Sequence, residues 1–127
     1  MRSNAARKVI RLALSVPEET LALQLRASNI TFLREFKAVP ERRWRFDFQI
    51  GMLLVEVQGG VWGAKKTAKN PEGKTGHNSG AGITRDCEKL NEVVARGYAV
   101  MHVTPAQVKS GQALAWIERW IARRNAA

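Results

Sequence analysis

A hairpin pattern, WRFDFQIGMLLVEVQGG, fills residues 44–60 and constrains the fold more than any other stretch of the sequence. Two apolar segments flank Gly51 and Met52, and a glycine that comes first in a two-residue loop is typical of a type II′ turn. Each predicted strand nevertheless carries one carboxylate, Asp47 in the first and Glu56 in the second. Acidic residues are poor strand formers and are costly to bury unpaired, so their position needs a physical reason.

The turn also predicts the register of the hairpin. With Gly51 and Met52 as the loop, Asp47 lies directly opposite Glu56, and directly paired residues point to the same face of a sheet, about 5 Å apart. Strict alternation gives one apolar face and one polar face. The apolar face holds Trp44, Phe46, Phe48, Val55 and Val57, and the other holds Arg45, Asp47, Gln49, Leu54, Glu56 and Gln58. A slip of one residue would scatter this set.

Two carboxylates this close repel each other unless a cation lies between them. A divalent ion would resolve the conflict, and hard oxygen ligands suit Mg²⁺ or Mn²⁺. Such an ion can activate water and stabilise charge on a phosphate. The alternative is a salt-bridge face, in which Arg34, Arg43 or Arg45 pairs with the two acids. The residues alone leave both interpretations open.

The rest of the chain predicts an α/β fold in the order helix, three-strand meander, helix, strand, helix. The expected elements are a helix in 16–30, strands in 30–39, 44–49 and 53–58, a helix over 83–97, a strand over 98–104 and a last helix that Thr104 caps. The apolar stripe of the second helix comprises Ile83, Cys87, Leu90 and Val94, and Asp86 and Lys89 lie to one side of it. His102 falls within the last strand, which reads as a core strand.

A length of 127 residues fits one domain, with residues 1–16 as a basic arm and residues 59–82 as a glycine- and lysine-rich loop. The net charge of +10 favours a polyanionic partner, of which nucleic acid is the leading candidate. No apolar run reaches the ~18 residues that a membrane span needs. The single cysteine, Cys87, fits a reducing cytoplasm.

Asp47 followed by Glu56-Val57-Gln58, within this order of elements, resembles the PD-(D/E)XK nuclease superfamily. The blocks RRWRFDF, VEVQGG, HNSGAG and DCEKLNE are similar to those of small phage and prophage endonucleases, over about residues 18–110. The resemblance implies a restriction-endonuclease-like αβββαβ core, a mixed four-stranded sheet flanked by helices, with a C-terminal helix added. It also implies metal-dependent hydrolysis of DNA, with Asp47, Glu56 and the Val57 carbonyl as metal ligands.

The chain departs from this family at Gln58, where the pattern has lysine. Glutamine cannot supply a positive charge to the transition state, so we expect Lys89 on the following helix to supply it. The alternative for Lys89 is a solvated surface lysine. A further acid often comes from the first helix of such nucleases, and Glu19 is the best placed, with Glu18 and Glu35 as rivals. Stabilisation of the helix dipole is the alternative role of Glu19.

The long loop carries further candidates for the site and for DNA contact. His77, in the HNSGAG block, could orient water or phosphate near neutral pH. Contacts with the phosphate backbone are expected from basic side chains on this loop and before the hairpin. These are Lys65, Lys66, Lys69, Lys74, Arg43 and Arg45.

The sequence therefore predicts a metal-dependent DNA endonuclease that uses Mg²⁺ or Mn²⁺, in the cytoplasm of a bacterial host or a phage-infected cell. One alternative is a structure-specific resolvase of branched DNA, for which a homodimer would be expected. Another is a non-catalytic DNA-binding module on a nuclease fold, in which Gln58 marks lost activity.

Overall fold

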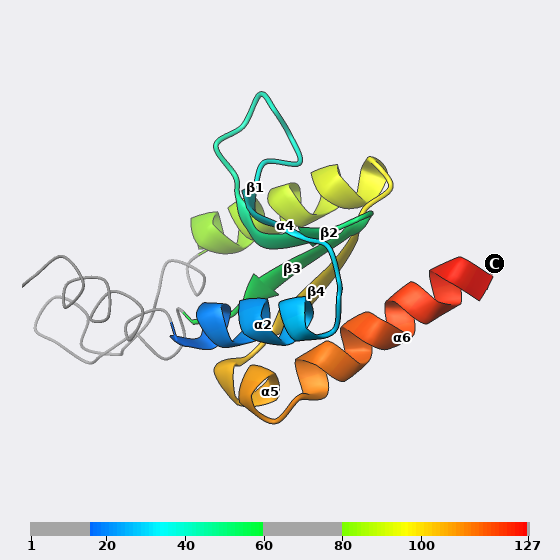
Figure 1. Cartoon of the computed structure of the whole chain (residues 1–127). Coiled ribbons are helices and arrows are strands. Elements are labelled where there is room, and N and C mark those ends of the chain that lie inside the picture. Colours follow the sequence, from blue (N-terminus) through cyan, green and yellow to red (C-terminus); the bar gives the residue numbers. More distant parts are fainter. Residues whose placement is uncertain (1–15, 60–79, 127) are drawn as a thin grey trace, which may run out of the picture. The chain divides into compact units, whose positions relative to one another are not determined.

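The computed structural model describes residues 16–59 and 80–126. They form two compact units, one of helices (residues 16–31 and 103–126) and one built on a sheet (residues 32–102). The predicted order of helices and strands is observed, except that the last helix is divided in two (Figure 1). The predicted α/β class is thereby confirmed.

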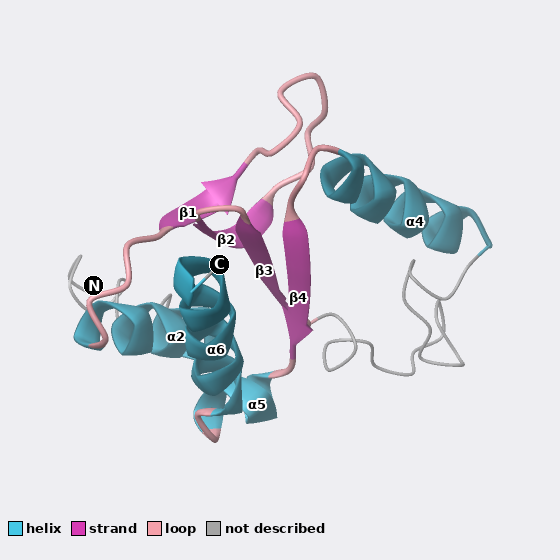
Figure 2. Cartoon of the chain, turned by 90° about the vertical axis from the view of Figure 1, so that its right-hand side faces the viewer, coloured by secondary structure: helices cyan, strands magenta, loops and turns pink. Residues whose placement is uncertain are grey.

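Four strands form the sheet, in the order β1-β2-β3-β4 (Figure 2). They are β1 (Leu33–Phe36), β2 (Phe46–Ile50), β3 (Leu53–Val57) and β4 (Ala99–Val103). The first three strands are antiparallel neighbours. β4 runs parallel to β3, because the Ala99 N–H donates to the Met52 carbonyl at 2.8 Å where both strands begin, and His102 meets Gln58 where both end. The sheet is therefore mixed, as predicted.

The hairpin turn has the predicted geometry. Gly51 has a φ of 59°, and Met52 is not among the residues of positive φ, which is the combination of a type II′ turn. Phe48 pairs with Val55, and the register continues through the turn. One residue further from the turn, this register brings Asp47 opposite Glu56, as the sequence predicts.

The predicted alternation of faces is wrong at Phe46. It should share a face with Phe48, away from Leu54, yet Phe46 and Leu54 lie in one buried cluster with Val93 of the following helix. The reason is local to the end of the hairpin. There Glu35, between Arg34 and Phe36 on the paired strand β1, has a φ of 50°, so the backbone departs from the extended conformation that a regular alternation of faces needs. The Val57 N–H donates to the Asp47 carboxylate at 2.8 Å at the same end of the hairpin.

Helix α4 (Gly80–Ala95) lies on one face of the sheet, as Val93 packs in the cluster with Leu54 (Figure 2). Its end is as predicted: Gly97 has a φ of 97°, and the Tyr98 N–H donates to the Val93 carbonyl at 3.0 Å. This is the Schellman arrangement that glycine favours. Its start is earlier than predicted, because the residues numbered 80–82, assigned to the loop, form its first turn.

The predicted core stripe of α4 is exposed. Ile83 is 52% exposed, Leu90 39% and Val94 51%, and Cys87 is also exposed. The neighbouring stripe faces the sheet instead: Gly82 and Val93 are buried, and Lys89 is half-buried between them. Helical periodicity identifies the apolar stripe of α4. The residues that contact the sheet, including Lys89, lie on the neighbouring stripe.

The helical unit contains α2 (Val16–Ala27), α5 (Pro105–Lys109) and α6 (Gln112–Ala126). Thr104 caps α5 as predicted, with a capping box that also involves Gln107. The single predicted last helix is broken at Gly111, whose φ of 87° is incompatible with a continuous helix. Among the described helices, none combines the length and the hydropathy that crossing a bilayer requires.

Candidate active site

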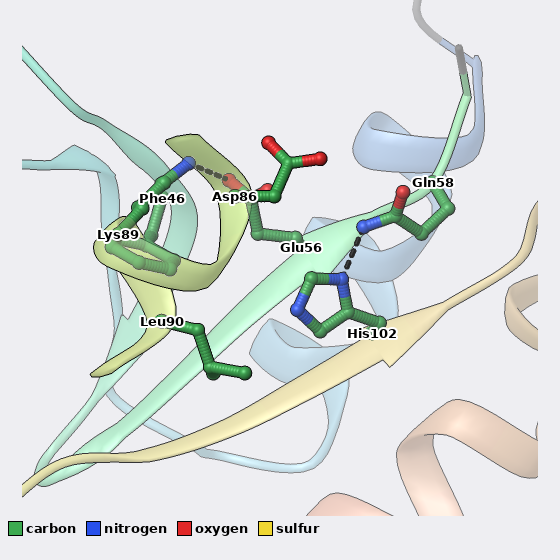
Figure 3. Close-up of a pocket in the computed structure, with 7 residues that line it drawn as sticks. All are labelled: Phe46, Glu56, Gln58, Asp86, Lys89, Leu90 and His102. Carbon is green, nitrogen blue, oxygen red and sulfur yellow. Dashed lines mark hydrogen bonds and ion pairs between the residues drawn. The ribbon is translucent and has the colours of Figure 1, made fainter. Parts of the chain in front are cut away.

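A cavity of about 230 Å³ opens between α4 and the ends of β3 and β4. Figure 3 shows the seven side chains that line it, namely Phe46, Glu56, Gln58, Asp86, Lys89, Leu90 and His102. Two acids, a lysine, an amide and an imidazole therefore meet beside two apolar side chains. Such a mixture of groups can bind and polarise a charged substrate.

Lys89 and Glu56 form the ion pair at the centre of this cavity. The Lys89 Nζ lies 3.2 Å from Glu56 Oε1 and donates to the Arg45 carbonyl at 3.2 Å. It also lies 4.4 Å from the centre of the Phe46 ring, within range of a cation–π contact. The side chains of Lys89 and Glu56 are 22% and 21% exposed, so Lys89 is not a solvated surface lysine. Lys89 therefore projects from α4 toward Glu56 on β3.

The carboxylate of Glu56 lies where little water reaches it. Burial raises the pKa of Glu56 above its ordinary value of 4.5, and the nearby negative charge of Asp47 raises the pKa further. Lys89 and His102 act in the opposite direction and only partly offset the burial. The two carboxylates thus interact electrostatically, as their predicted pairing requires, and an additional cation would favour the charged form of Glu56.

Asp47 has a neighbouring strand on each side. One carboxylate oxygen accepts the Val57 N–H at 2.8 Å. On the other side lies β1, where Arg34 pairs with Phe48 and Phe36 with Phe46, so Glu35 is opposite Asp47. Carboxylate oxygens of Glu35 and Asp47 lie within 4.8 Å of each other. Glu35 has a φ of 50°, in the left-handed region that costs a non-glycine residue about 1 kcal/mol or more.

His102 is a member of the cavity that the sequence prediction missed. It was expected in the core, but it is exposed, and its Nδ1 lies within hydrogen-bond distance of the Gln58 Nε2 (Figure 3). Alternation along β4 could have indicated this, because its neighbour Val103 is fully buried. Gln58 also lines the cavity.

The predicted DNA-contacting residues are only partly described. Arg43 and Arg45 are exposed in the segment that leads into β2, and the Arg45 Nη1 donates to the Glu35 carbonyl at 3.4 Å. Glu19 lies in the first turn of α2, in the helical unit. The predicted loop residues lie outside the described residues; they are His77, Lys65, Lys66, Lys69 and Lys74.

Comparison with known proteins gives one informative likeness. No protein-family model matches the chain. No curated protein matches it either. Among solved structures, the chain is similar to the "Homing Endonuclease I-Bth0305I Catalytic Domain", with a TM-score of 0.58 and 21% identity. The likeness covers 84% of this chain and 94% of that one. The chain therefore has a nuclease-like fold.

Proposed function

We propose that this protein is a divalent-metal-dependent DNA endonuclease of the PD-(D/E)XK type that hydrolyses phosphodiester bonds. The observation that carries the proposal is that Glu56 lines a cavity into which Lys89 projects, while Asp47 stands opposite Glu56 on the neighbouring strand. The fold, shared with a homing endonuclease catalytic domain, and the net charge of +10 add support. The fold and the positive charge both favour DNA as the substrate.

The donor set fits Mg²⁺ or Mn²⁺. Asp47, Glu56 and the Val57 carbonyl would hold the ion, and all three are hard oxygen donors of the kind these ions prefer. The electrostatics of Glu56 point the same way, since burial and Asp47 both disfavour its negative charge. The bound ion would supply charge neutralisation at the phosphate and activation of the attacking water.

The other side chains of the cavity would position the reactants. Lys89 would stabilise negative charge that develops on the phosphate, as its Nζ already lies 3.2 Å from Glu56 Oε1. Gln58 would orient water through its amide. His77 and Glu19 remain candidates for further contacts with water or phosphate. Arg43, Arg45 and the lysines of the 59–82 loop would hold the duplex by its backbone.

The test is cleavage of supercoiled plasmid, linear duplex and a four-way junction, with Mg²⁺, Mn²⁺ or EDTA. We expect cutting that needs the metal, and we expect Asp47→Asn and Glu56→Gln to abolish it while DNA binding persists. Wild-type cutting by either variant would show that the site is wrong. Preferred cutting of the junction would identify a resolvase.

A non-catalytic DNA-binding module is the second candidate, favoured by the glutamine at position 58. It predicts salt-dependent DNA binding without cleavage of any of the three substrates, in either metal. The same experiment therefore separates the two functions.

A further inference from the structure

We propose that His102 is a positioning residue that fixes the orientation of the Gln58 amide, so that Gln58 presents its carbonyl oxygen to the reacting groups. The inference rests on the proposed function, since it assigns a role within the same site. Its basis is the contact between Gln58 Nε2 and His102 Nδ1 at the end of two parallel strands.

The amide of Gln58 has a donor end and an acceptor end, and the contact with His102 decides which end faces the cavity. An imidazole Nδ1 without a proton is an acceptor, so the amide nitrogen donates to it. The amide oxygen then points away from the ring (Figure 3). An oxygen in that position can accept a hydrogen bond from a water molecule. This hydrogen bond would orient the lone pair of the water for attack on the phosphate.

The walls of the cavity explain why the amide needs this constraint. Glu56 and Asp86 line the same cavity, and both are carboxylates. Carboxylates accept hydrogen bonds, so without a competing acceptor they would attract the amide N–H groups of Gln58. The amide would then offer donors to the place where water must be held. His102 provides the competing acceptor on the side away from α4.

The position of His102 at the end of β4 suits this role. β4 lies beside β3, and the parallel arrangement places residue 102 next to residue 58 where both strands end. His102 is exposed and lines the cavity, so its ring is not a packing element of the core. It acts through Gln58, which is why we class it as a positioning residue.

The first test is the tautomer of His102, read from the nitrogen chemical shifts of its ring by NMR on the full chain. The chain has two histidines, so a His77→Ala variant assigns the signals. We expect the neutral ring to carry its proton on Nε2, and we expect Gln58→Ala to weaken this preference. A proton on Nδ1 in the wild type, or tautomer populations unchanged in Gln58→Ala, would overturn the proposal.

The second test is kinetic and uses metal-dependent plasmid cleavage. We expect His102→Leu, which lacks the acceptor, to lower kcat about tenfold at unchanged KM. His102→Asn, whose side-chain oxygen can accept in place of Nδ1, should restore most of the rate. In a Gln58→Ala background the His102→Leu change should have no further effect. Additive losses would show that His102 acts independently of Gln58 and would contradict the proposal.

The two tests separate this inference from the proposed function. A wild-type chain that cuts no DNA contradicts the proposed function and, with it, a role for His102 in cleavage. The NMR result then still decides whether His102 fixes the Gln58 amide. A chain that cuts DNA but shows the Nδ1 tautomer keeps the function and loses the inference.

Discussion

The two faces of α4 differ in what they contact and in how much water reaches them. On the inward face, Val93 is fully buried and Lys89 forms a half-buried pair with Glu56. On the outward side, Val94 is 51% exposed, and Glu88 pairs with Arg42 while their side chains are 43% and 51% exposed. Adjacent residues of similar type thus lie in opposite environments. The comparison teaches that contacts with the sheet, and not the apolar stripe, set the rotation of this helix.

Removal of Lys89 should have the largest effect. Lys89→Met deletes the cation beside Glu56, and if Lys89 stabilises charge on the phosphate, kcat should fall about 10²- to 10³-fold. Plasmid cleavage at saturating metal measures it. Arg96→Met is the matched control, because Arg96 is a cation just beyond the end of α4 whose partners are Glu41 and Glu92. Equal losses in both variants would mean that only net charge matters.

The paired valines test the packing half of the comparison. Val93→Ala should lower the free energy of unfolding by about 2 kcal/mol, since it removes buried methyl groups and leaves a cavity. Val94→Ala should change it by less than about 0.5 kcal/mol, because half of that side chain already meets water. Urea denaturation measures both variants. A larger loss from Val94→Ala would show that the outward stripe is covered in solution.

Titration should distinguish the inward pair further. The pKa of Glu56 is higher in the folded chain than in the unfolded chain. At a pH between these two pKa values, the folded chain keeps a proton that the unfolded chain has released. The stability that this provides is full below about pH 4.5 and is lost as the pH rises through the raised pKa. The free energy of unfolding of the metal-free wild type should therefore fall relative to that of Glu56→Gln over this interval.

Urea titrations from about pH 4 to about pH 8 measure this difference. Lys89→Met provides the internal control, because Lys89 lowers the pKa of Glu56. Without Lys89 the decline should extend to higher pH. A wild type that gains stability relative to Glu56→Gln over the same interval would contradict the burial of this carboxylate.

These contrasts explain how much of the site the sequence could predict. Asp47 and Glu56 were predictable because a two-residue turn fixes their register through the chain itself. The orientation of α4 was not, since it depends on a contact between residues 33 positions apart, Lys89 and Glu56. His102 was missed because a short strand with apolar neighbours resembles a core strand. The contact between His102 and Gln58 follows only once β3 and β4 are known to be parallel neighbours.

The exposed pair gives the smallest effect and completes the comparison. A double-mutant cycle on Arg42 and Glu88 should give a coupling energy below about 1 kcal/mol, which falls as salt is added, because water screens both charges. Arg42→Ala alone should cost more than Glu88→Gln, since Arg42 also lies 4.7 Å from the centre of the Trp44 ring. The same cycle on Lys89 and Glu56 should give a larger and less salt-sensitive coupling, because these side chains are half as exposed. Equal couplings would mean that the position on α4, and not burial, sets the strength of both pairs.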